Sequence, residues 1–382
     1  MGTGAAFSAI SCEQVVMHVV YVVTSSRRDV YTAMTRLSIV SLRLTNPGAK
    51  VTVVVDAESD RAIRGVCDHL LGEADEWLVF ETPPGPPVFR NRYIKTQVRN
   101  LLDGPFLFLD SDTFVRGDLS PIFASTCDVA LATNHSADLY QDQVWGNDAD
   151  LAARMKWQFN RTCYLNGGLI YYQDNPPARA LASEWHRLWL ESLPHNIDCR
   201  DQAALNSAIH TVNPCVEILS SRFNAQIVKN QWIAPSAVVW HYYSENDLHD
   251  MPDLHRLVEV GMSANSLPAE DVAKAAQSRN PWGDSYWRHG RGLDFINAAA
   301  SNVRNSIQAQ GCAEAVLVKL QMIDPRVLQY VVCLAVNRAI QAREYYVIRK
   351  LLLHRSIIRA PQIAVSLTVA LFRAIRSIPD EN

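Results

Sequence analysis

The sequence has no excess of charge of either sign. It contains 36 Lys and Arg against 39 Asp and Glu, which gives a formal net charge of −3 at pH 7. A nucleic-acid-binding domain normally carries a strongly basic surface, so we expect no nucleic acid partner. Apolar residues make up 48% of the chain and charged residues 20%, which excludes both a disordered chain and a wholly membrane-embedded protein.

Cysteine motifs and targeting segments are also lacking. The eight cysteines are spread along the chain without a C-x-x-C pair, which excludes the usual zinc spacing and a thiol redox motif. Reduced thiols are therefore the expected state. The first residues have neither the basic start nor the long apolar stretch of a secretory signal. We expect a cytoplasmic protein.

The first 250 residues alternate between strand and helix patterns. Residues 15–23 form a β-branched run typical of a strand buried on both faces. A helical segment at 30–44 and a second buried strand at 50–56 complete a β-α-β unit, and 105–109 is a further buried strand. This order predicts an α/β fold whose mostly parallel sheet is flanked by helices and binds ligands at the carboxyl ends of its strands.

The composition changes after residue 251. We divide the chain into a catalytic domain at 15–250, a Trp/Gly-rich segment at 251–300 and a basic helical region at 301–382. The middle segment either completes the active site or links the other two regions. Between residues 319 and 378 there are ten Lys or Arg and two acids, and the longest uncharged run, 360–372, has 13 residues. A membrane-spanning helix needs about 20. The pattern favours either a peripheral contact with an anionic membrane surface or a helical subdomain with a solvated basic face.

An acidic motif follows the buried strand at 105–109. Asp110 and Asp112 are separated by Ser111, so a rigid strand end holds two carboxylates close together. Hard divalent cations bind such oxygens and keep positions for phosphate oxygens, and a bound cation neutralises charge on a diphosphate leaving group. The simpler interpretation is an Asp pair that caps a turn.

The motif belongs to an ordered set of segments that resembles a known family. Residues 90–123, RNRYIKTQVRNLLDGPFLFLDSDTFVRGDLSPIF, look like the signature of GT-A fold glycosyltransferases and are closest to glycosyltransferase family 8. LNGGL at 165–169, DQAALN at 201–206 and His241 at the end of VVWH follow in the family's order. The likeness covers residues 15–245.

The resemblance implies a role for each matching residue. Asp110, Asp112 and His241 would bind the metal, and imidazole beside carboxylates favours Mn²⁺ over Mg²⁺. The donor-binding residues that it implies are Thr24, Arg92, Lys95, Asp110, Ser111, Asn166 and Gly167. Asp201 would bind a sugar hydroxyl and Gln202 would face the reaction side of the anomeric carbon. Without the resemblance, His241 would be a core histidine, Asn166 a turn residue and Asp201 a helix N-cap.

The chain departs from the family at three places. Tyr93 stands where the family has an arginine, with Arg90 and Arg92 nearby, so the arginine that serves the site is open. The Lys-Pro-Trp that binds the diphosphate in the family is absent after His241. Residues 280–292, which include Arg288, are the segment that could fold back over the phosphates instead. Residues 24–31, which follow the first strand, lack the acidic cluster that the family has there, except for Asp29.

The resemblance implies a metal-dependent hexosyltransferase. A hexose-type sugar would move from a nucleotide-diphosphate donor, with UDP expected, to a hydroxyl of a saccharide, lipid-linked or protein acceptor, with retention of anomeric configuration. One alternative is an inactive transferase-like binding protein, which the missing Lys-Pro-Trp favours. Another is a haloacid-dehalogenase-type phosphatase, whose motif also begins with D-x-D but requires Thr or Val where this chain has Phe114.

Overall fold

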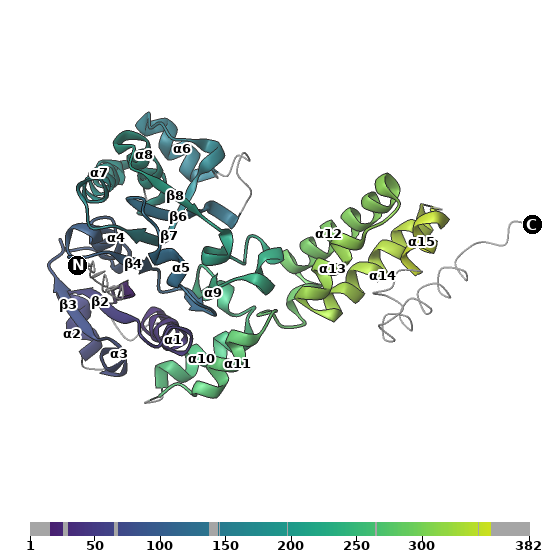
Figure 1. Cartoon of the computed structure of the whole chain (residues 1–382), viewed down its shortest axis with the longest axis horizontal. Coiled ribbons are helices and arrows are strands. Elements are labelled where there is room, and N and C mark those ends of the chain that lie inside the picture. The colour runs from purple at the N-terminus through teal and green to yellow at the C-terminus, as the bar shows by residue number, and fades with distance from the viewer. Residues whose placement is uncertain are drawn as a thin grey trace, which may run out of the picture.

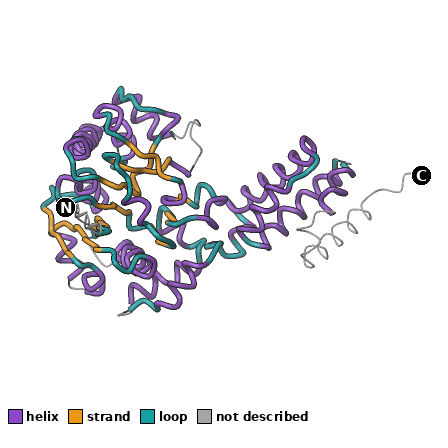
Figure 2. The backbone as a smooth tube through the Cα atoms, viewed as in Figure 1, coloured by secondary structure: helices purple, strands orange, loops and turns teal. Residues whose placement is uncertain are grey.

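A computed structural model gives the fold of the chain (Figure 1). The structure describes residues 16–352 apart from 26–29, 65–67, 137–143, 145, 197, 264–265 and 343. Asp29 and the apolar run at 360–372 lie outside the described residues. Figure 2 shows the strands gathered in one part of the molecule, while the helices continue into a second part.

A seven-stranded sheet forms the centre of the first part. The strand order is β3-β2-β1-β4-β7-β6-β8, in which β7 is the one strand that runs antiparallel to its neighbours among the described residues. The strands are β1 His18–Val23, β2 Lys50–Asp56, β3 Glu76–Phe80, β4 Phe106–Leu109, β6 Val129–Thr133, β7 Leu165–Tyr172 and β8 Val216–Leu219. The predicted α/β class with a mostly parallel sheet is confirmed.

Helices cover both faces of this sheet because its strands are apolar on both sides. In β1, Val19, Tyr21 and Val23 share an apolar cluster with α1 and α2, whereas Val20 and Val22 share another with α4, α7 and α8. Alternate residues of a strand point to opposite faces. The helices that precede β8 are α1 Val30–Thr45, α2 Ala57–Arg64, α3 Asp68–Glu73, α4 Pro87–Lys95, α5 Ser120–Phe123, α6 Gly146–Met155, α7 Pro176–Ser192 and α8 Gln202–Val212.

A second, three-stranded sheet lies beside the end of β4. It pairs β10 (Val239–His241) with β5 (Thr113–Val115) and β9 (Ala225–Gln226). In the antiparallel register between β10 and β5, His241 faces Thr113. This pairing brings the late histidine next to the acidic motif, which immediately precedes β5.

The second part of the molecule is helical. Helices α10 (Pro252–Ser263) and α11 (Ala269–Gln277) pack against α1, and α9 spans Glu245–Leu248. An arm of four helices then projects from the sheet-containing part (Figure 1). The arm consists of α12 Gly290–Gln310, α13 Glu314–Ile323, α14 Pro325–Gln341 and α15 Tyr345–Leu352. Among the described helices, none is long and apolar enough to cross a membrane.

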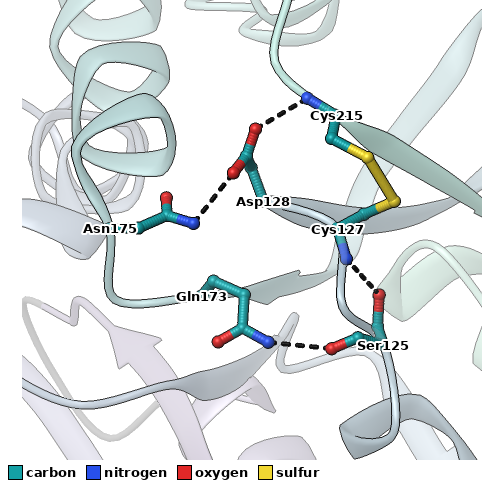
Figure 3. The surroundings of a disulfide bond; sticks show 6 residues. All are labelled: Ser125, Cys127, Asp128, Gln173, Asn175 and Cys215. Atoms are coloured by element: carbon teal, nitrogen blue, oxygen red, sulfur yellow. Dashed lines mark hydrogen bonds between the residues drawn. A yellow bond between two sulfur atoms is a disulfide. The ribbon is translucent and has the colours of Figure 1, made fainter.

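The expectation of reduced thiols is wrong for one pair. Cys127 and Cys215 form a disulfide across 88 residues of sequence (Figure 3). They precede β6 and β8, which pair in parallel from Val129 and Val216 onward. The carboxylate of Asp128 supports the same corner by accepting hydrogen bonds from the Cys215 amide at 2.7 Å and from Asn175 at 2.8 Å. Only the pairing of the strands makes the two cysteines neighbours.

Candidate active site

Asp110, Ser111 and Asp112 form the turn between β4 and β5. The backbone amide of Asp110 donates to the carbonyl of Gly168 in β7 at 2.9 Å, and the Thr113 hydroxyl donates to the carbonyl of Asp110 at 2.8 Å. The turn is therefore tied to strands on both sides. Such support keeps the two carboxylates in a fixed geometry rather than on a loose loop.

The structure brings His241 against these carboxylates. One ligand atom from each of Asp110, Asp112 and His241 can be chosen so that all lie within 4.8 Å of one another, and His241 Nε2 is 3.3 Å from Asp112 Oδ1. Two carboxylates and an imidazole make a donor set suited to Mn²⁺. The residues present therefore fit a divalent cation.

The electrostatics of Asp112 and His241 are coupled. Burial alone would raise the pKa of Asp112, but His241 and Lys95 favour its charged form and the pKa lies below the usual value. Burial alone would lower the pKa of His241, yet Asp112 raises it above 6.5. Each group stabilises the charged form of the other, and a cation that displaces the imidazolium proton would take over that role.

Gly168 is required by the position of His241. A Cβ at residue 168 would lie 2.2 Å from His241 Cε1 and 2.8 Å from Nδ1, which are impossible contacts. The neighbouring Gly167 packs against Leu205 and Trp185 of the helices behind the strand. The glycines inside this strand thus mark a close approach of another side chain, as glycines within strands often do.

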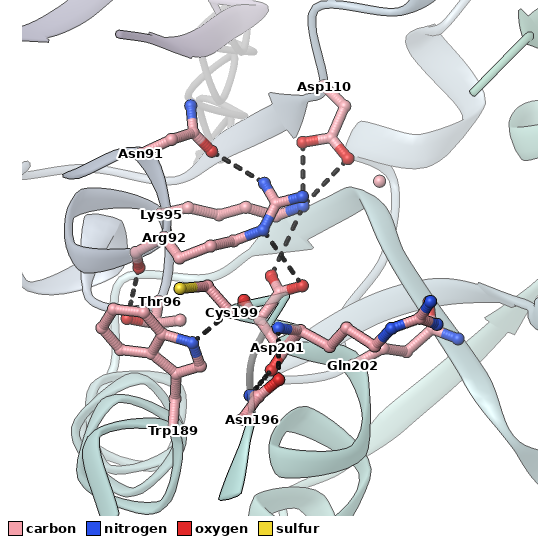
Figure 4. A network of polar contacts seen from close by, with 12 residues as sticks. Asn91, Arg92, Lys95, Thr96, Asp110, Trp189, Asn196, Cys199, Asp201 and Gln202 are labelled. Atoms are coloured by element: carbon pink, nitrogen blue, oxygen red, sulfur yellow. Dashed lines mark hydrogen bonds and ion pairs between the residues drawn. The ribbon is translucent and has the colours of Figure 1, made fainter. Parts of the chain in front are cut away.

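Two cations from α4 lie between the acidic groups (Figure 4). Lys95 Nζ is 2.8 and 2.9 Å from the two oxygens of Asp110 and 3.6 Å from Asp201 Oδ2. Arg92 Nε is 3.3 Å from Asp201 Oδ1. Burial opposes the charged form of Asp201, but Arg92 and then Lys95 hold its pKa below the usual value. Asp201 precedes α8 without a side-chain cap hydrogen bond, so its carboxylate serves the ion pairs instead.

The two arginines of α4, Arg90 and Arg92, have different surroundings. Arg92 lies beside Asp201 and lines the cavity at the acidic motif, whereas Arg90 pairs with Asp56 at 2.9 Å and with Glu58. Tyr93 points to the other side and makes an edge contact with His186, with ring centroids 4.9 Å apart. Tyr93 therefore takes no place at the acidic motif.

Two cavities meet at the acidic motif and share Arg92, Asp110, Asp112 and Tyr243. The larger, of about 840 Å³, has mainly apolar walls and reaches Thr24 and Ser111. The smaller, of about 550 Å³, is polar. Its other lining residues include Lys95, Asn134, His135, Asp148, Asn166, Gly167, Gly168, Asp198, Arg200, Asp201, Gln202, Lys229 and His241. Every predicted site residue thus lines one cavity or both.

Gln226 connects two other residues of the site, and the sequence does not predict this role. Its Oε1 accepts hydrogen bonds from the His135 backbone amide at 2.5 Å and from the Tyr243 hydroxyl at 2.6 Å. Both partners have left-handed backbones, with φ of 56° and 68°, a conformation that costs non-glycine residues about 1–3 kcal/mol. The Tyr243 ring stacks on His241 with centroids 5.0 Å apart. No motif marks these residues in the sequence.

The segment 280–292 contributes mainly to packing. Trp282, Tyr286 and Trp287 contact one another in the apolar core, with ring centroids 4.9 to 5.2 Å apart. Arg288 does not reach the cavities and donates to the Tyr330 hydroxyl at 3.1 Å. Arg291 instead binds Asp247, six residues after His241, at 2.7 Å.

Comparison with known proteins finds distant structural likeness. No family model and no curated protein matches the chain. The galactosyltransferase LgtC, solved with donor and acceptor sugar analogues, is 17% identical, with a TM-score of 0.42 over 66% of this chain and 98% of LgtC. The glycosyltransferase GlyE of Streptococcus pneumoniae is 13% identical, with a TM-score of 0.42 over 68% of this chain and 63% of GlyE.

Mouse xyloside xylosyltransferase 1 is a third similar structure. It is 11% identical, with a TM-score of 0.40 over 59% of this chain and 97% of that chain. These likenesses are too distant to assign the chain to a family.

Proposed function

We propose that this chain is a metal-dependent glycosyltransferase of the GT-A type. It transfers a hexose-type sugar from a UDP-sugar to an acceptor hydroxyl, with retention of anomeric configuration. The observation that carries the proposal is the cluster of Asp110, Asp112 and His241 at the junction of two cavities. A cation bound there would contact the diphosphate between the nucleoside and the sugar.

The two cavities suit the two halves of such a donor. The larger cavity has apolar walls, including Val22, Pro87 and Val258, which suit a flat nucleoside. The smaller cavity is lined by carboxylates, amides and cations, which suit sugar hydroxyls and a second, hydroxyl-bearing substrate. Ligand sites generally combine apolar walls with a few placed polar groups.

The charged side chains of the smaller cavity favour the binding of a divalent cation together with an anionic ligand. Its lining includes four cationic side chains, Arg92, Lys95, Arg200 and Lys229, and five aspartates, Asp110, Asp112, Asp148, Asp198 and Asp201. With His241 neutral, as an imidazole bound to a metal is, the aspartates exceed the cations by one charge, and a divalent cation reverses the sign. A diphosphate would then enter a site of opposite charge.

The side chains divide the work of sugar transfer between them. The cation would act as a Lewis acid that stabilises charge on the departing diphosphate. Lys95 and Arg92 hold Asp201 beside the transferred sugar, where it accepts a hydrogen bond from a hydroxyl. Gln202 lines the same wall. Entry of the acceptor hydroxyl on the face that the diphosphate leaves needs such positioning more than a strong nucleophile.

Lys229 is our candidate for the diphosphate contact that Lys-Pro-Trp provides in family 8. It lines the smaller cavity together with the three candidate metal ligands. Burial and then Arg291 lower the pKa of Lys229, while Asp247 opposes this shift. Arg291, from a distant segment, thus disfavours the charged form of Lys229, and an arriving phosphate would favour that charged form.

A screen of nucleotide sugars for Mn²⁺-dependent hydrolysis tests the proposal. We expect turnover of at least one UDP-sugar that stops when the metal is chelated. Metal-dependent nucleotide binding without turnover for any donor or acceptor would instead establish a binding protein. Release of phosphate from phosphomonoesters would establish the phosphatase.

We also propose a cytoplasmic protein whose basic C-terminal region contacts anionic membranes. Within the described part, Arg349 and Lys350 lie on α15 near Tyr346, which is 54% exposed. Removal of residues 353–382 should weaken binding to vesicles of anionic lipid and leave donor hydrolysis in solution unchanged. Unchanged vesicle binding would favour a structural role for this region.

A further inference from the structure

A chain of buried amides joins the candidate metal ligand His241 to Gln202. Asn224 Oδ1 lies 2.9 Å from His241 Nδ1, and Asn224 Nδ2 lies 2.9 Å from Asn166 Oδ1. Asn166 Nδ2 in turn lies 2.9 Å from Gln202 Oε1. Asn224 is fully buried, and Asn166 is 5% exposed.

The backbone amide of Gly168 fixes the direction of every bond in this chain. An amide N–H can only donate, and that of Gly168 lies 2.9 Å from Asn166 Oδ1, so this atom is the carbonyl oxygen. Asn224 must then present its NH₂ group to Asn166 and its own oxygen to His241. The Nδ1 atom of His241 is therefore the donor.

This direction prepares His241 for a metal. With its proton held on Nδ1 by Asn224, the ring presents the Nε2 lone pair toward Asp112 and Asp110, where the cation would bind. Hydrogen-bond partners of this kind orient metal-bound histidines and raise their basicity. The same Asn224 amide, through Asn166, holds the carboxamide of Gln202.

We propose that Asn224 is a positioning residue that couples the metal site to Gln202 and thereby to the sugar. The inference rests on the proposed function. Asn224 ends the 3₁₀ turn Ser221–Asn224, immediately before β9, and its two amide atoms serve the two directions separately. One atom can therefore be changed without the other.

The substitution Asn224→Asp keeps the contact with His241 and removes the contact with Asn166. The aspartate still accepts the His241 Nδ1 proton, but its second oxygen meets the Asn166 oxygen and cannot donate to it. We expect Mn²⁺ to bind as tightly as in the wild type, measured by calorimetry with the metal alone. The kcat of donor hydrolysis at saturating Mn²⁺ should fall about a hundredfold. Asn224→Ala removes both contacts, so Mn²⁺ affinity should also fall about tenfold.

Two further variants distinguish positioning from a general loss of structure. Asn46 is 5% exposed and bonds to Thr45, Gly117 and Leu119, away from the cavities, so Asn46→Asp controls for a buried charge and should leave kcat unchanged in the folded enzyme. In a Gln202→Ala background, Asn224→Asp should lose most of its effect on kcat, because coupled residues are not additive.

The proposal is overturned if Asn224→Asp turns over like the wild type, or if its effect is undiminished in the Gln202→Ala background. Loss of Mn²⁺ binding by Asn224→Asp would equally contradict it. Failure of the proposed function is distinguishable, because it appears as Mn²⁺ binding without turnover in the wild type itself. The Mn²⁺ affinity of Asn224→Ala then still judges the link between Asn224 and His241.

Discussion

The sheet-containing part and the helical part bury different kinds of side chain. Up to His241 the described interior includes many polar groups, among them Arg90, Lys95, Asp112 and Asn224. Beyond His241 the buried residues of the described chain are apolar or aromatic, apart from glycine and proline. Burying a polar group is costly unless it is paired, so the paired polar interior of the sheet-containing part, which includes the acidic motif, is separated from the apolar packing of the helical part.

The largest expected effect tests this separation directly. Asp112→Ala removes a carboxylate from the candidate metal cluster and should lower donor hydrolysis at least about a thousandfold, since a bound metal contributes several kcal/mol. Asp294→Ala, at an exposed position of α12, should leave the rate unchanged. Comparable rates for wild type and Asp112→Ala, measured with saturating Mn²⁺, would remove Asp112 from the metal site.

Gly168→Ala should come next in size. The new methyl group would force His241 out of its position, so we expect Mn²⁺ affinity to fall about a hundredfold in titrations with the metal alone. Gly48→Ala is the matched control, because a Cβ at residue 48 meets nothing within 4 Å. Equal affinities of the two variants would show that His241 does not bind the metal.

A core substitution in the arm should lower stability without changing the catalytic rate. Leu320 in α13 is fully buried, and Leu320→Ala should lower the free energy of unfolding by about 2–4 kcal/mol. The kcat of the folded enzyme at low temperature should not change. Val318→Ala, at a 43% exposed position of the same helix, should alter stability by less than about 0.5 kcal/mol. A large change in kcat for Leu320→Ala would join the arm to catalysis.

The smallest expected effect is a dependence of stability on pH in the sheet-containing part. Burial lowers the pKa of His186 to about 4, and burial with Lys229 does the same for His135. The unfolded chain takes up these protons near pH 6.5, so stability is complete above that pH and declines toward pH 4. His186→Gln should reduce the decrease in melting temperature across this range by roughly 3 °C. An unchanged decrease would contradict the assignment to His186.

The sequence was sufficient for the fold class and for the residues of the acidic motif. Apolar strands with alternating helices predicted the sheet, and the motif order brought Asp110, Asp201 and His241 into one hypothesis. The structure places them around the same junction because β10 pairs with β5, directly after the acidic motif, and because Arg92 and Lys95 of α4 form ion pairs with Asp201. A motif with fixed spacing can be recognised locally, since its residues are neighbours along the chain.

Residues that become neighbours only through folding, and that belong to none of the family-like segments, could not be predicted. Asn224 ends a short 3₁₀ turn and Gln226 lies in the two-residue strand β9, 17 and 15 positions before His241, and neither differs from an ordinary polar residue in the sequence. Cys127 and Cys215 meet through the pairing of β6 with β8.

The arm is not attached by a flexible linker. Met34 and Leu37 of α1, Leu257 of α10, Ile296 of α12 and Val336 of α14 belong to one continuous apolar cluster, and interiors packed in this way resist deformation. Any molecule bound at the far end of the arm is consequently held at a set distance and angle from the cavities. Under the proposed function, the length of the arm would then limit which hydroxyl of a large or surface-bound acceptor can reach the cavities.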